Sequence, residues 1–98
     1  MARPKFNALS PPPETSEQGG EEILRAVIVN GGLQVSIRRG FERVDVWGIL
    51  LADLARHASR IFARETDVSE EAALERIVRM FLKEMGRPTD LGTTDTIQ

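Results

Sequence analysis

Apolar and small residues recur at helical spacing from Val44 to Arg64, in the stretch VDVWGILLADLARHASRIFAR. At about 100° per residue, the large apolar side chains fall on one face of a helix and the arginines fall on the far side. The apolar face comprises Trp47, Leu50, Leu51, Leu54, Ala58, Ile61 and Phe62, and the adjacent stripe of small residues comprises Gly48, Ala52, Ala55, Ser59 and Ala63. The pattern predicts a long amphipathic helix against which the rest of the chain packs.

A second, shorter helix is predicted from the capping signals that enclose the next apolar pattern. Ser69 is a good N-cap, and it is followed by two acidic residues in the first turn. Gly86 is expected at the C′ position, and Pro88 prevents further helix. One face of this helix is apolar and comprises Leu74, Ile77, Val78, Phe81, Leu82 and Met85.

Before these helices, two β-rich runs flank Asn30-Gly31, which is a strong signal for a hairpin with a type I′ turn. The two-residue loop defines the pairing. It places Val29 opposite Gly32, Ile28 opposite Leu33, Ala26 opposite Val35 and Leu24 opposite Ile37. The last three pairs are apolar and share one face, whereas a three-residue loop would place Arg25 on the buried side. The tight turn is therefore favoured.

Together these elements predict an α+β fold, a small two-layer ββαα domain in which a β-hairpin precedes a long helix and a shorter antiparallel helix. The domain is expected to span residues 21–86. Residues 1–20 contain four prolines and end on two glycines, so we expect a flexible arm without a helix or central strand. Residues 87–98 lack periodicity and are expected to form a flexible tail.

This domain is small for the apolar surface that it carries. A two-stranded ribbon is marginal by itself and has two open edges. The long helix is apolar or small over more than half of its circumference, which one hairpin and one helix would cover only with crowding. We therefore predict a homodimer, formed by two hairpins joining into one sheet or by the small-residue stripe meeting its twin. The same stripe would equally suit close approach by the second helix of the same chain.

Composition limits the classes of partner and the cellular compartment that we expect for the chain. The net charge is −2, so no global cationic field attracts nucleic acid. Cysteine is absent, which excludes disulfides and thiolate chemistry. No apolar run approaches the roughly 20 residues of a membrane span, and the N-terminus has no secretory signal pattern. We expect a cytoplasmic protein without membrane contact.

Five segments carry a resemblance to a known family. They are PKFNAL, GGLQVSIRR, WGILLADLARHASRIFA, SEEAALERI and RPTDLGTT. Together they resemble the bacterial family named domain of unknown function 5076, over nearly the whole chain. The resemblance implies a compact α+β domain in the bacterial cytoplasm and brings no activity with it. If the RPTD segment recurs in the family, the resemblance implies that part of Arg87 to Thr94 is ordered.

Residues with catalytic potential are few. His57 is the only histidine and lies four residues after Asp53, within reach on one helix. An aspartate-oriented histidine is a fragment of a general base, but no nucleophile points to the same side. No spacing of His, Asp or Glu suggests a metal site, and no glycine-rich loop suggests a phosphate or cofactor site. We therefore expect a protein that is not an enzyme and has no catalytic, cofactor-binding or metal-binding residues.

An interaction domain with an unidentified protein partner is the favoured function. Trp47 is interpreted either as core or as an interface anchor, and Ile49 projects away from the apolar face. The candidate interface comprises Trp47, Gly48, Ile49, Ala52, Arg56, Arg60 and Arg64. The alternative is a nucleic-acid-binding regulator that uses Arg38, Arg56, Arg60 and Arg64. Residues 21–86 hold ten basic and eleven acidic residues, and this balance disfavours the alternative.

Overall fold

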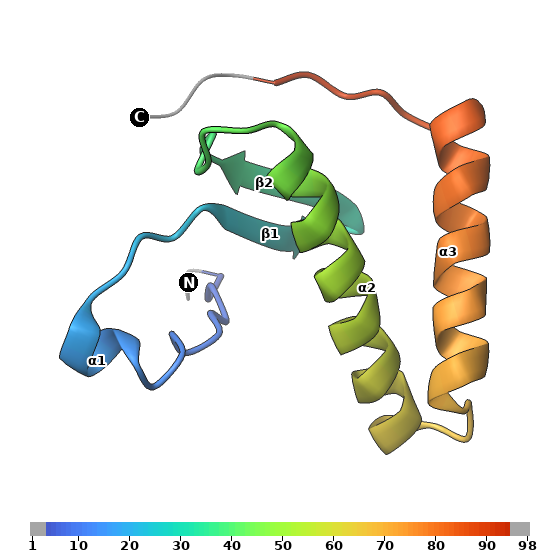
Figure 1. Cartoon of the computed structure of the whole chain (residues 1–98), viewed down its shortest axis with the longest axis horizontal. Coiled ribbons are helices and arrows are strands. Elements are labelled where there is room, and N and C mark those ends of the chain that lie inside the picture. The colour runs from blue at the N-terminus through green and yellow to red at the C-terminus, as the bar shows by residue number, and fades with distance from the viewer. Residues whose placement is uncertain (1–3, 95–98) are drawn as a thin grey trace. The chain divides into compact units, whose positions relative to one another are not determined.

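A computed structural model describes residues 4–94 of the chain, which divides between Arg38 and Arg39 into two compact units. The first unit contains α1 (Thr15–Gln18), β1 (Leu24–Val29) and β2 (Gly32–Ile37), and the second contains α2 (Asp45–Glu65) and α3 (Glu70–Gly86) (Figure 1). A two-stranded antiparallel hairpin followed by two long helices confirms the predicted α+β fold class. One continuous domain over residues 21–86 stays a prediction. Within the described residues, no helix is long and apolar enough to cross a bilayer.

The β1–β2 hairpin has the predicted register at every pair, from Leu24 opposite Ile37 to Val29 opposite Gly32. Asn30 and Gly31 have φ values of 50° and 81°, as a type I′ turn requires at its two central positions. No other element of the first unit packs on the hairpin, and burial of its apolar face against the helices stays a prediction. We name this exposed surface the hairpin face; it comprises Ile28, Leu33, Val35 and Ile37.

The N-terminal arm differs from expectation in one place, since Thr15–Gln18 forms a single helical turn, α1. The prolines before it lack N–H donors, but their carbonyl groups remain free to accept. The hydroxyl groups of Thr15 and Ser16 donate to the carbonyl oxygens of Pro12 and Pro13, at 2.7 and 2.9 Å. A proline-rich lead-in therefore nucleates one turn where no helix was expected.

The boundaries of the two long helices follow the capping signals closely. Asp45 begins α2, and Ser69 is the N-cap of α3, where its Oγ accepts the backbone N–H of Ala72 at 3.1 Å. The expected C′ role of Gly86 is wrong, because Gly86 lies inside α3. The N–H of Arg87 still donates to the carbonyl of Lys83, at 2.9 Å, and so extends the helical bonding one residue further.

Helices α2 and α3 run antiparallel and lie closest at their connected ends (Figure 1). The two buried residues among those described are small and lie one on each helix. Ser59 of α2 is fully buried, and Ala73 of α3 is 5% exposed. Small residues on both helices permit close approach of their backbones. The core of the second unit is therefore a narrow contact near the α2–α3 connection, whereas the helices diverge toward their other ends (Figure 1).

Candidate interaction surface

The side of α2 that packs on α3 is the small-residue stripe, not the leucine-rich face. Ser59 is buried, and Ala55 and Ala63, one turn to either side of it, are half-buried. Leu54 lies five residues before Ser59, which is about 140° around the helix. It is 43% exposed, and Ile61 on the same face is also exposed. We name this surface the α2 leucine face; it comprises Leu51, Leu54 and Ile61. Helix α3 lies against the stripe beside this face, which is the second of the two uses that the sequence allowed for the stripe; the expectation that α3 covers the leucine face is wrong.

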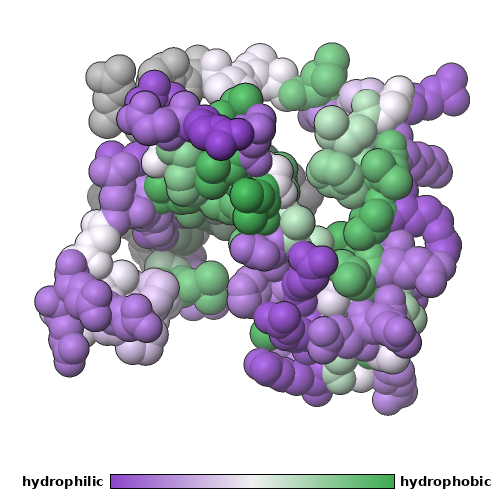
Figure 2. All heavy atoms as spheres, viewed as in Figure 1, coloured by the Kyte–Doolittle hydropathy of each residue, from purple (hydrophilic) through white to green (hydrophobic). Residues whose placement is uncertain are grey.

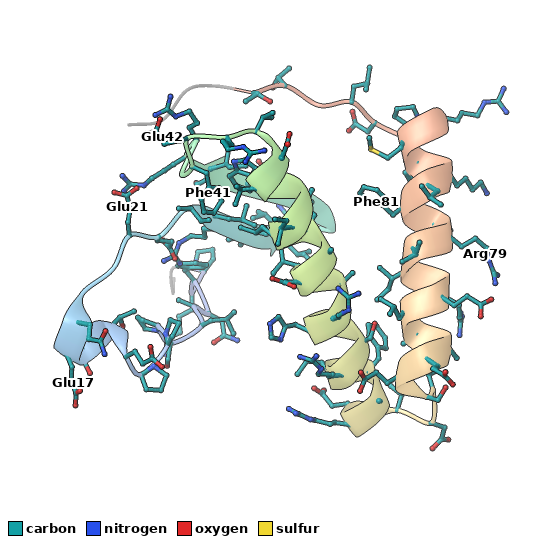
Figure 3. All side chains as sticks on the ribbon, in the orientation of Figure 1. Glu17, Glu21, Phe41, Glu42, Arg79 and Phe81 are labelled. Atoms are coloured by element: carbon teal, nitrogen blue, oxygen red, sulfur yellow. The ribbon has the colours of Figure 1, made fainter. Side chains whose placement is uncertain are left out.

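Helix α3 also has an apolar surface that remains open. Hydrophobic atoms gather along the side of α3 turned toward α2, and hydrophilic atoms line its other side (Figure 2). Phe81 projects toward the α2 side, whereas Arg79 points the opposite way (Figure 3). Because the helices diverge, Phe81 is still 46% exposed. We name this surface the α3 apolar face; it comprises Val78, Phe81, Leu82 and Met85, which are all exposed.

Trp47 lies in the first turn of α2 and is half-buried. Its indole N–H donates to the carbonyl oxygen of Arg39 at 2.7 Å. Its ring meets that of Phe41 edge to face, with 5.8 Å between centroids. Gly40, between Arg39 and Phe41, has a φ of 72°, in the left-handed region that favours glycine. Trp47 thus fixes the segment that leads into α2, and this contact agrees with its interpretation as a core residue.

The remaining apolar and small members of the candidate interface lie on the open end of α2. Gly48, Ile49 and Ala52 are exposed, and a Cβ atom added to Gly48 would meet no other atom within 4 Å. Ile49 projects into solvent as predicted, with 62% of its surface exposed. The small-residue stripe is therefore divided: its Ser59 end is used within the chain, and its Gly48 end is open.

The three arginines of the candidate interface are all exposed, but they differ in their surroundings. The guanidinium of Arg60 lies 3.8 Å from the Glu70 carboxylate and 3.5 Å from Nδ1 of His57. Arg38, in the first unit, donates to the carbonyl oxygen of Glu22 and lies 3.8 Å from the Glu21 carboxylate. Two of the four arginines of the nucleic-acid-binding alternative therefore have acidic neighbours, which lowers the positive electrostatic potential that the four present together.

His57 is exposed and lies beside Arg60 rather than in a hydrogen bond with Asp53. A general base needs an orienting acceptor and a reacting proton within hydrogen-bond reach. On α2, the neighbour of His57 is instead the cationic guanidinium of Arg60. Within residues 4–94, no three His, Asp or Glu side chains lie close enough together to hold a metal ion.

Two features of the second unit were missed by sequence reasoning. The first is a hollow of about 430 Å³ near the α2–α3 connection, whose wall is mostly apolar. It is lined by Phe62, Thr66, Val68, Ala73, Arg76, Ile77 and Met80. The second is the attachment of the tail to α3, since the Thr89 hydroxyl and N–H both donate to the Glu84 carboxylate. These two hydrogen bonds, the hydroxyl first, lower the pKa of Glu84 below its ordinary value.

Comparison with known proteins identifies the family. The model of the family described as Domain of unknown function (DUF5076) matches residues 8–89. The chain belongs to this family. A solved structure from the photosynthetic bacterium Rhodopseudomonas palustrus CGA009, provisionally named a pyruvate dehydrogenase, is 46% identical, with 100% of each chain covered and a TM-score of 0.75. No curated protein matches the chain.

Family membership confirms the resemblance drawn from the five sequence segments. The matched region ends at Thr89, so this DUF5076 match includes the residue that binds Glu84. The sequence signal for this contact was the RPTD segment, in which Thr89 is the third residue. The hollow had a weaker signal: Val68 and Ala73 stand at the two positions of a hydrophobic staple around Ser69.

Proposed function

We propose that this member of the DUF5076 family is a non-enzymatic interaction domain that associates with a second copy of itself. The observation that carries the proposal is that three apolar surfaces, the hairpin face, the α2 leucine face and the α3 apolar face, have no partner within their own units. Solvent-exposed leucines occur singly on most proteins, whereas contiguous apolar surfaces mark interaction sites.

The free energy available from covering one apolar face can be estimated from its exposed residues. Covering a half-exposed leucine or phenylalanine contributes about 1 kcal/mol, half of the value for full burial. The four residues of the α3 apolar face would then contribute about 4 kcal/mol, which is only the lower estimate of the cost of association. In a two-fold dimer every surface is used twice, so the same face contributes about 8 kcal/mol. Covering this face on both copies of a dimer would therefore offset the lower estimate of the cost of association.

A non-enzymatic role is supported by the surroundings of the single histidine. Its neighbour is a guanidinium, and Asp53 does not orient it. The provisional name of the Rhodopseudomonas structure points instead to oxidation of a 2-oxo acid. Pyruvate-dependent turnover by the purified chain, lost in the His57→Ala variant, would contradict the non-enzymatic proposal.

Light scattering after size-exclusion chromatography tests self-association directly. The mass should rise with concentration toward twice the 10.9 kDa of one chain. The dimer should persist in about 1 M salt, because burial of apolar surface is not screened as ion pairs are. A mass of 10.9 kDa across the micromolar to millimolar range would overturn the proposal.

A further inference from the structure

We propose that two copies pair through the open edge of β2, antiparallel, so that one four-stranded sheet with the order β1-β2-β2-β1 crosses the dimer. This inference rests on the proposed self-association and names the surface that carries it. Three observations support it: the phase of the backbone hydrogen bonds, the difference between the two edges, and the self-complementary sequence of β2.

The phase of the hairpin determines which backbone groups face outward. Arg38 N–H donates to the carbonyl of Ile23 at 2.9 Å, so these opposed residues form a hydrogen-bonded pair. Hydrogen-bonded pairs alternate along an antiparallel ladder. Gln34 and Ser36 therefore bond inward to β1, together with Gly32. The N–H and C=O groups of the alternate residues face the open edge of β2; these residues are Leu33, Val35 and Ile37.

The two edges of the sheet differ in protection. Strand β1 carries Arg25, whose guanidinium binds both carboxylate oxygens of Glu22 at 3.0 Å. The central carbon of the same guanidinium lies over the ring of Phe6, from the N-terminal arm, at 5.4 Å from the ring centroid. Charge and covering segments are two of the devices by which proteins block strand pairing at an edge. Strand β2 has neither charge nor proline, and all six of its residues are exposed.

The sequence of β2 is complementary to itself. In an antiparallel pair with its two-fold axis at Val35, each Val35 faces the Val35 of the other copy. Leu33 then faces Ile37, and Gln34 faces Ser36. Every apolar side chain is opposite an apolar one, and every polar side chain is opposite a polar one. This symmetry favours a second copy over a strand from an unrelated partner. The hairpin face would then continue without interruption across the dimer.

Amide hydrogen exchange measured by NMR on the full chain tests the pairing. At concentrations where light scattering shows a dimer, the Val35 amide should exchange at least 10-fold more slowly than the Ala26 amide. Ala26 is the cross-strand partner of Val35 and faces the opposite edge, so it is a matched control. Protection of Val35 should decrease on dilution. A dimer in which Val35 exchanges as fast as Ala26 would overturn β2 pairing while leaving self-association intact; a monomer would overturn both.

Proline substitution gives an independent test. Val35→Pro removes the outward N–H and leaves the inward hydrogen bonds of the hairpin in place, as edge strands tolerate. It should weaken dimerisation at least 10-fold. Ala26→Pro places the same residue at the matched position of β1 and should leave the dimer mass unchanged. Equal dissociation by both variants, or by neither, would refute the assignment to β2, and circular dichroism checks that both retain their helices.

Discussion

Replacing Ser59 with leucine tests whether α3 packs on the small-residue stripe. Ser59 is the only fully buried side chain among the described residues, yet its chemistry is modest: Oγ donates to the carbonyl oxygen of Ala55 at 2.8 Å. That carbonyl also accepts the helical N–H one turn later, so it is not left unpaired when the hydroxyl is removed. Position 59 should therefore be sensitive to size and insensitive to polarity.

The expected magnitudes separate these two effects. Ser59→Leu forces a larger side chain into the contact with α3, and overpacking of this kind costs about 1–3 kcal/mol. Ser59→Ala loses a hydrogen bond worth about 1 kcal/mol but gains helix propensity of about 0.5 kcal/mol, so stability should change by about 0.5 kcal/mol. In a domain of this size about 1 kcal/mol moves the melting temperature by roughly 4–8 °C.

Thermal unfolding followed by circular dichroism at 222 nm measures both variants. Ser59→Leu should lower the melting temperature by at least about 5 °C, and Ser59→Ala by clearly less. Arg56→Leu is a matched control, because it adds leucine to an exposed position of the same helix and should change stability by about 0.5 kcal/mol or less. Equal melting temperatures for Ser59→Leu and Ser59→Ala would refute close packing at this position.

Three further predictions follow from the helix ends and the open part of the stripe. Gly48→Ala should stabilise the chain by about 0.5–1 kcal/mol in urea denaturation, because the added Cβ meets open space; destabilisation would indicate that another chain approaches there. Ser69→Ala should lower the free energy of unfolding by about 1 kcal/mol in the same assay, because the hydrogen bond from the Ala72 N–H is lost, and Ser69→Asp should restore the stability. Equal stability of the wild type and both variants would contradict the capping role. The pKa of Glu84 is lowered, so its contact with Thr89 is complete above the ordinary carboxyl pKa and is lost as the pH falls through the lowered value. The NMR resonance of the Thr89 amide should therefore shift at that lower pH. A resonance that does not shift would contradict the contact.

Local signals in the sequence were sufficient for the hairpin and the two long helices, but not for the single turn α1. Asn30-Gly31 determines the hairpin register because a two-residue turn with positive φ at both positions permits only one pairing. Ser69 specifies where α3 begins because its side chain replaces a missing intrahelical acceptor. The end of α3 was less determined, since Gly86 is compatible both with a helix and with a left-handed cap, and here it is helical.

The tertiary structure decided which faces pack and which remain open. The sequence of α2 offers two neighbouring surfaces, large apolar and small, and the hydrophobic pattern alone favoured the leucine-rich one. Close approach of two helix backbones requires small side chains, so α3 contacts Ser59 and leaves Leu54 exposed. Periodicity identifies an apolar face but not its partner, because burial depends on the distance and angle between elements that are set only when they pack.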